Sequence, residues 1–135
     1  MDTNRKKMNI QALIICLLLV LSCTKEKKET ERSYPRVITG AVTNITAAGA
    51  TFNGAFLQAG NSEIIDHGFV FGLSSFGKPT IQTCEKISLG QSFGKGSFTA
   101  TANFGLTAGK TYYVSAYAQI KDNIYYAEPV SFVSK

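Results

Sequence analysis

From residue 35 onward, apolar side chains alternate with polar ones at a period of two, in short runs bounded by Gly, Asn, Ser and Asp. This spacing predicts β-strands, because successive side chains of a strand point to opposite faces, and it does not support helices. The predicted strands span residues 37–42, 50–57, 66–73, 97–104, 111–120 and 124–133, with weak strands near 80–83 and 86–89. About seven short strands at this spacing predict an all-β sandwich of two sheets.

The last two runs predict a β-hairpin whose register follows from parity. If Val114 and its alternate neighbours face the core, then Tyr126, Val130 and Phe132 must face it too. That requirement selects a three-residue loop that ends at Asn123, with Asn123 in the left-handed conformation.

The same parity gathers three tyrosines, Tyr113, Tyr117 and Tyr125, on the outer face of this hairpin. Tyrosine combines an apolar ring with a polar tip and is enriched where proteins contact partners, so this face is a candidate binding surface. The alternative is that tyrosine is simply a favourable strand residue. The chain holds no tryptophan, which weakens the case for a carbohydrate-binding platform.

The first 23 residues have the layout of a secretion signal. Arg5, Lys6 and Lys7 precede a ten-residue apolar run, 12–21, which is too short to cross a bilayer but suits a signal peptide. The run ends in Val20-Leu21-Ser22-Cys23, a sequence that resembles the lipobox of bacterial lipoproteins. The resemblance implies that Cys23 becomes the first mature residue and carries a thioether-linked diacylglycerol and an acylated amine.

The residues after Cys23 mix Lys, Glu, Thr and Arg and predict a solvated tether, which cannot continue a core helix. The chain is therefore divided into a signal peptide (1–22), a lipidated tether (23–34) and a folded domain (35–135). The early Lys and Glu positions resemble the export signals of surface lipoproteins in Bacteroidetes-type bacteria. That resemblance implies a lipid-anchored protein of the outer membrane, and it leaves open whether the protein faces the periplasm or the exterior.

Within the predicted domain, Leu106 precedes Tyr112 by six residues across a turn at Ala108-Gly109. This arrangement resembles the signature of fibronectin type III domains, immunoglobulin-like sandwiches in which the turn is usually Pro-Gly. The resemblance implies a tyrosine corner, in which the Tyr112 hydroxyl bonds backbone a few residues upstream. Phe71 stands where the repeats common in exported Bacteroidetes proteins usually have Trp. Sandwiches of this kind host many unrelated functions, so the resemblance specifies the fold and not the role.

The formal net charge of +5 is distributed unevenly along the chain. Residues 1–22 contribute +2 and residues 24–34 contribute +1, so the domain keeps seven basic against five acidic residues. No basic face is expected on the domain, which argues against a nucleic-acid-binding protein.

The residues that could carry chemistry are few and scattered. His67, the only histidine, follows Asp66 in a strand, so we expect a solvated or edge histidine and not an acid/base pair. Cys84 is expected to be a half-buried thiol in an irregular segment, and one His with one Cys cannot supply a zinc site. The glycine-rich stretch 90–96 lacks the order of a phosphate-binding loop and is interpreted as a flexible connection. The acidic residues of the domain are interpreted as solubility charges: Glu63, Asp66, Glu85, Asp122 and Glu128.

These features favour a membrane-anchored, non-enzymatic interaction or adhesion module of the cell envelope. We expect no cofactor and no metal, and a protein or glycan partner whose identity the sequence leaves open. The main alternative is a protein that captures glycans or small ligands for a polysaccharide-uptake system. A small hydrolase that uses carboxylates or Cys84 is the third hypothesis.

Acylation of Cys23 is directly testable. Cells that express the wild type are expected to incorporate radiolabelled palmitate into the protein, whereas a Cys23→Ala variant lacks the acceptor thiol and is expected to incorporate none. Equal labelling of the two proteins, or no labelling of the wild type, would contradict the lipid anchor.

Overall fold

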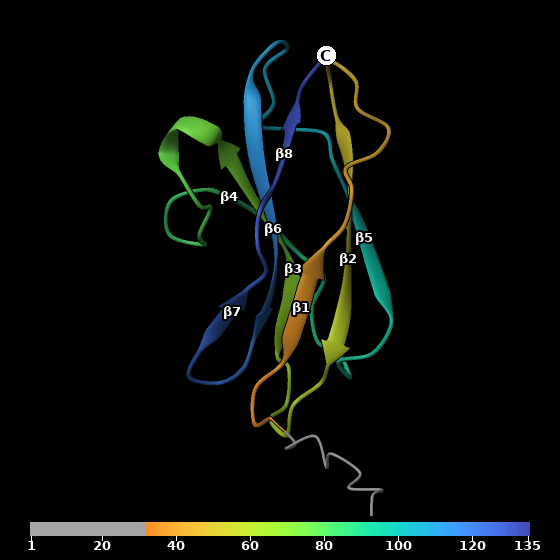
Figure 1. The fold of residues 1–135 in the computed structure, drawn as a ribbon, viewed down its shortest axis with the longest axis vertical. Coiled ribbons are helices and arrows are strands. Elements are labelled where there is room, and N and C mark those ends of the chain that lie inside the picture. Colours follow the sequence, from red (N-terminus) through yellow and green to blue (C-terminus); the bar gives the residue numbers. More distant parts are fainter. Residues whose placement is uncertain (1–31) are drawn as a thin grey trace, which may run out of the picture. The chain divides into compact units, whose positions relative to one another are not determined.

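The alternating pattern forms eight strands and one short helical turn in the computed structural model, which describes residues 32–135 (Figure 1). In chain order the elements are β1 (Arg36–Thr39), β2 (Ala50–Gln58), β3 (Asp66–Leu73), η2 (Ser74–Phe76), β4 (Glu85–Ser88), β5 (Ser97–Ala102), β6 (Thr111–Gln119), β7 (Ile124–Tyr126) and β8 (Val130–Val133). The expected signal peptide, Cys23 and most of the expected tether lie outside the described residues. Among residues 32–135, the structure contains no helix that could span a bilayer.

The strands make two antiparallel sheets that face each other (Figure 1). One sheet has three strands in the order β1-β2-β5. The other has the order β4-β3-β6, and both β7 and β8 pair with the edge of β6 that points away from β3. The prediction of an all-β, two-sheet sandwich is confirmed. The strands number eight instead of about seven because the last predicted strand is divided into β7 and β8.

The core joins the two sheets through aromatic rings. Phe52 of β2 is fully buried, and its ring centroid lies 5.1 Å from that of Phe71 and 5.7 Å from that of Phe69, both on β3. The ring of Phe132, on β8, is 5.6 Å away. Tilted and edge-on aromatic pairs at these separations attract each other beyond the effect of area burial. Phe71 is thus the buried aromatic side chain that the fibronectin resemblance placed in the position of Trp.

A tyrosine corner closes the connection between β5 and β6. The Tyr112 hydroxyl accepts a hydrogen bond of 2.7 Å from the backbone N–H of Thr107, five residues upstream. Gly109, in the turn between them, has φ +77°, a left-handed conformation that glycine adopts without steric penalty. The corner implied by the resemblance is therefore present, although Ala108 replaces the usual proline.

Several predicted strand segments are absent or shorter, and the first of them ends at Thr39 instead of residue 42. Residues 80–83 form a turn in which the Cys84 N–H bonds the Thr80 carbonyl, so the weak strand predicted there is wrong. β5 ends at Ala102, before the predicted limit, because its partner strand β2 begins at Ala50, directly opposite. Pairing with a neighbour, and not the local alternation, decides where this strand ends.

The β6–β7 hairpin has a different register from the predicted one. Gln119 pairs with Ile124, and the Ile120 N–H bonds the Asn123 carbonyl, which leaves a two-residue tip at 121–122. The predicted three-residue loop is wrong. The left-handed conformation predicted for Asn123 is wrong too, because among residues 32–135 only Asn44 combines a side chain with a positive φ.

An irregular stretch at 127–129 restores the predicted register farther along the chain. Val114 pairs with Val130, as predicted. Tyr117, however, pairs with Tyr126, which is one residue out of step with that register. The stretch between β7 and β8 contains one residue more than the part of β6 that it faces. Pro129, in this stretch, has no backbone N–H to donate to a ladder.

Truncating the central ring should destabilise the domain strongly. Phe52→Ala is expected to lower the free energy of unfolding by about 3–5 kcal/mol, because it leaves a cavity bordered by three rings. Urea unfolding followed by circular dichroism measures this change. Phe76→Ala is the control, since Phe76 is 70% exposed and its truncation should cost less than about 0.5 kcal/mol. Similar losses in the two variants would show that Phe52 does not hold the sheets together.

Candidate functional site

The three tyrosines predicted to share a binding face do not lie together. Tyr113 and Tyr117 occupy the face of β6 that points away from the core, as predicted, but Tyr117 is fully buried and Tyr113 is half-buried. Tyr125 pairs with the core residue Ala118, so it lies on the opposite face of the sheet. Tyr126 takes the position predicted for Tyr125, beside Tyr117. The register of β7 is the cause, because each residue of slip turns a side chain to the other face.

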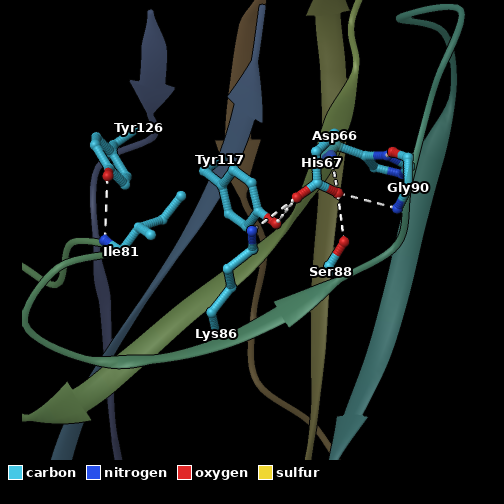
Figure 2. Close-up of polar contacts among 8 residues, drawn as sticks. All are labelled: Asp66, His67, Ile81, Lys86, Ser88, Gly90, Tyr117 and Tyr126. Atoms are coloured by element: carbon cyan, nitrogen blue, oxygen red, sulfur yellow. Dashed lines mark hydrogen bonds and ion pairs between the residues drawn. The ribbon is translucent and has the colours of Figure 1, made fainter.

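The segment between η2 and β4 covers part of this outer face. The Ile81 N–H donates a 3.1 Å hydrogen bond to the Tyr126 hydroxyl, and Lys78 forms a 3.0 Å ion pair with Glu128. Pro79, between these two anchoring residues, is buried. Figure 2 shows Ile81 and Tyr126 meeting across the face. The chain itself therefore occupies space that a ligand on this face would need.

Tyr117 belongs to a polar cluster centred on Asp66, at the start of β3 (Figure 2). The Asp66 carboxylate accepts hydrogen bonds from five donors. The donors to Oδ1 are the backbone N–H groups of His67 and Gly90, at 2.9 and 3.0 Å, and Ser88 Oγ, at 2.5 Å. The donors to Oδ2 are Tyr117 Oη, at 2.8 Å, and Lys86 Nζ, at 3.0 Å. The cluster thus ties β3 to β4, to β6 and to the loop after β4.

These contacts set the protonation states of the two acids. Burial by itself raises the pKa of Asp66, but the hydrogen bonds from Ser88 and the other donors, with the Lys86 charge, hold it below its ordinary value of 3.8. Burial first, and then the Asp66 carboxylate, raise the pKa of the Tyr117 hydroxyl well above its ordinary value of 10.0. At neutral pH the carboxylate is therefore ionised and the phenol is protonated, which suits a permanent structural contact.

The prediction of a solvated or edge histidine is wrong, because His67 is only 9% exposed. Its Nδ1 donates to the Gly90 carbonyl at 2.6 Å, and its ring packs against Phe56 and Phe98 at 5.6 and 4.9 Å. Asp66 contacts the backbone N–H of His67 and not the ring, as expected for neighbours on opposite strand faces. His67 is thus a satisfied core residue and not half of an acid/base pair.

Cys84 lies in the turn before β4 as a free, half-buried thiol, as predicted. Its Sγ packs against Gly72, where an added Cβ would come within 2.6 Å of the sulfur. Gly72 and His67 are five positions apart on β3, which separates the thiol from the ring by roughly 17 Å along the strand. A Cys84–His67 dyad is therefore not assembled.

The carboxylates of the domain occupy separate places. Glu63 accepts a hydrogen bond from Gln91, whereas Glu128 pairs with Lys78. The interpretation of Asp66 as a solubility charge is wrong, because only 14% of its side chain is exposed. In the part of the chain that the structure describes, no three His, Cys, Asp or Glu side chains gather as a metal ion would require.

A groove between the two sheets unites residues that the sequence did not connect. It has a volume of about 450 Å³ and lies between β1 on one side and β7, the 127–129 stretch and Val130 on the other. Tyr125 stacks on Tyr34 here, with ring centroids 5.1 Å apart and ring planes at 14°. Arg32 lies 5.8 Å from the centroid of the Tyr34 ring and donates a 3.2 Å hydrogen bond to its hydroxyl. We call this site the tyrosine groove.

Local folding explains why sequence analysis missed the tyrosine groove. The sequence pattern assigns Tyr34 to the tether, whereas Pro35, next to it, is fully buried and β1 begins at Arg36. The Thr39 hydroxyl then accepts a 2.9 Å hydrogen bond from the Ala116 N–H, which joins β1 to β6 of the other sheet. The one local signal was the Tyr-Pro pair before the first strand, because a residue that precedes proline favours extended backbone.

Comparison with known proteins shows that this chain is similar in fold to solved structures. Two solved structures of the sensor domain of the anti-sigma factor RsgI4 in Pseudobacteroides cellulosolvens are similar to this chain, each with a TM-score of 0.56 and 14% identity. For the short form of the sensor domain, the alignment covers 76% of this chain and 95% of the sensor domain. For the solution structure, it covers 74% of this chain and 74% of the sensor domain. A titin fragment aligns with a TM-score of 0.46 and 15% identity, over 77% of this chain and 32% of that chain. No family model and no curated protein matches the sequence.

The Asp66 cluster should make the stability of the domain depend on pH. Because the pKa of Asp66 is lower in the folded chain than in the unfolded chain, its carboxylate stabilises the fold above about pH 4. This contribution is lost as the pH falls through the lowered pKa. Asp66→Asn is expected to reduce the free energy of unfolding by about 1.5–3 kcal/mol at neutral pH, and by much less near about pH 2.

Urea unfolding of wild type and variant at the two pH values measures this difference. Asp122→Asn, at the exposed tip of the β6–β7 hairpin, is the matched control and should leave stability unchanged at both. An Asp66→Asn effect of the same size at both pH values would mean that the charge of Asp66 does not contribute.

Proposed function

We propose that this chain is a non-enzymatic interaction module of the bacterial cell envelope, anchored in the outer membrane by lipid on Cys23, whose tyrosine groove binds an extended segment of a protein partner. The observation that carries the binding proposal is the stacked Tyr34–Tyr125 pair in a groove bordered by strands of both sheets. The proposed anchor rests on the lipobox resemblance and provides the location.

The walls of the tyrosine groove suit an extended partner. β1 is the last strand of the three-stranded sheet, and β7 and β8 lie at the edge of the other sheet. An edge strand presents backbone N–H and C=O groups that a peptide can satisfy by pairing as an added strand. Ile38, on β1, lines the groove and is 42% exposed, so it offers an apolar contact to such a peptide.

The charges along the groove favour an acidic partner segment. Arg32 and Arg36 both line the groove, whereas the carboxylate in its lining, Glu128, is paired with Lys78. A guanidinium group binds a carboxylate through two parallel hydrogen bonds, which adds both energy and orientation. A segment that combines Asp or Glu with apolar residues at alternate positions matches this surface.

Asp66, His67 and Cys84, the residues considered above for acid/base or nucleophilic chemistry, are engaged away from the groove. Asp66 is an ionised acceptor within its cluster, His67 bonds Gly90 in the core, and Cys84 packs on the far half of β3. None of the three lines the tyrosine groove. These positions support binding over catalysis as the role of this surface.

Capture of a glycan is the alternative function for the same groove. A stacked tyrosine pair can pack against the apolar face of a sugar ring, and arginine can donate hydrogen bonds to an acidic sugar. Such a protein would serve a polysaccharide-uptake system. The two strand edges favour a peptide over a sugar, because they offer a row of backbone groups at strand spacing.

A peptide library displayed on phage tests the groove. Selection on the mature protein is expected to enrich peptides in which acidic residues flank an apolar stretch. Tyr125→Ala and Arg36→Ala are each expected to bind the selected peptides roughly tenfold more weakly in titration calorimetry, since each removes a groove contact. Tyr113→Ala is the matched control, because Tyr113 lies outside the groove, and it should bind as the wild type does.

The two functions give different results in this experiment. If the selected peptides bind Tyr125→Ala as tightly as the wild type, the groove is not the binding site. If purified acidic oligosaccharides bind while no peptide is enriched, and Tyr125→Ala loses that binding, the glycan alternative is correct.

A further inference from the structure

We propose that the domain rests on the lipid surface through one end of the sandwich, with the Phe93 ring inserted among the lipid headgroups. This end, which we call the loop end, consists of residues 59–65, 89–96 and 120–123. The inference rests on the proposed lipid anchor and adds to it an orientation and a second membrane contact.

The segments of the loop end touch one another. Gly94 packs so closely on the 59–65 segment that an added Cβ would lie 2.6 Å from Ala59 Cα. Ile64 and Ser92 form an isolated β-bridge. The Ile65 N–H bonds the Gln119 carbonyl, which places the 120–123 hairpin tip at the same end. Three connections that are distant in sequence therefore form one continuous surface.

Apolar side chains are exposed on this surface. Phe93 is 96% exposed, which makes it the most exposed large apolar side chain among residues 32–135. Ile65 and Leu89, at the ends of the adjoining strands, are exposed as well. Exposed aromatic and aliphatic side chains in water mark a contact surface, and Phe and Leu enter the boundary between headgroups and acyl chains readily.

The position of the tether brings this end to the membrane. The Ser33 carbonyl accepts hydrogen bonds from the Asn61 N–H and the Ser62 hydroxyl, both at 3.4 Å, so the chain joins the domain at the loop end. Only residues 24–31 separate Cys23 from Arg32, and they span at most roughly 30 Å. The opposite end lies farther away by the length of β2, whose nine residues also extend roughly 30 Å. A short tether therefore favours the loop end as the one that meets the bilayer.

The charges of the loop end permit this contact. The basic residues there are Lys95 and Lys121, and the acidic ones are Glu63 and Asp122. Glu63 accepts a hydrogen bond from Gln91 within the surface. Lys95, two positions after Phe93, can extend its ammonium group to lipid phosphates while its methylene chain lies beside the apolar region. The surface is close to neutral, so apolar insertion and not charge provides the attraction.

Tryptophan fluorescence tests the orientation, because the chain contains no tryptophan of its own. The lipidated mature protein with Phe93→Trp is incorporated into vesicles of phosphatidylethanolamine and phosphatidylglycerol, with or without brominated acyl chains. We expect a blue-shifted emission and roughly twofold quenching by the brominated lipid, since the indole would sit at the interface. Phe76→Trp is the matched control: it lies beyond the opposite end of β3, is 70% exposed, and should stay unquenched.

The outcomes separate this inference from the proposed anchor. Mass spectrometry of Cys23 reports acylation independently, and an unmodified Cys23 would refute the anchor and the inference together. If Cys23 is acylated but the tryptophan at position 93 is unquenched, or both variants are quenched equally, the orientation is wrong and the anchor stands. A blue shift without quenching would mean that position 93 docks on protein, which also overturns the lipid contact.

Discussion

The packing of Phe52 against Phe69, Phe71 and Phe132 is the interaction on which the rest of the structure depends. These rings belong to β2, β3 and β8, so the cluster holds both sheets together and holds each strand in register. A slip of one residue in any of the three strands would turn its ring from the core to solvent. A domain of this size has a small core, which makes each contact a large part of its stability.

The Asp66 cluster adds a polar constraint to this apolar one. Removing a carboxylate from water costs free energy, and five donors offset that cost. The same contacts occupy the groups from which an acid/base site would have to be built, since His67 and Tyr117 both serve the architecture. Residues that look chemical in the sequence are thus engaged in holding β3, β4 and β6 together.

The irregular stretch at 127–129 links the core to the tyrosine groove. It lets β8 keep Phe132 in the core while β7 runs one residue out of step. That offset turns Tyr125 toward Tyr34 and sends Tyr126 to the face covered by Ile81. The Ala116 N–H, which β6 presents beside this stretch, bonds Thr39 of β1 and brings the two sheet edges together. The proposed binding site therefore follows from the same local departure that moves the tyrosines away from their predicted places.

The period-two alternation by itself determined the fold class, most of the strands and the faces of Phe52, Phe69 and Phe71, because a strand's two faces are a local property of the chain. The fibronectin type III resemblance, carried by the spacing of Leu106 and Tyr112, implied the Tyr112 corner, whose two partners are five residues apart. The binding face could not be predicted in this way. Whether Tyr117 is exposed depends on a covering segment distant in sequence, and whether Tyr125 meets Tyr34 depends on one residue of register between β7 and β6. Only the tertiary structure decided these points, because pairing between strands and burial by remote segments are set by the packing of the whole domain.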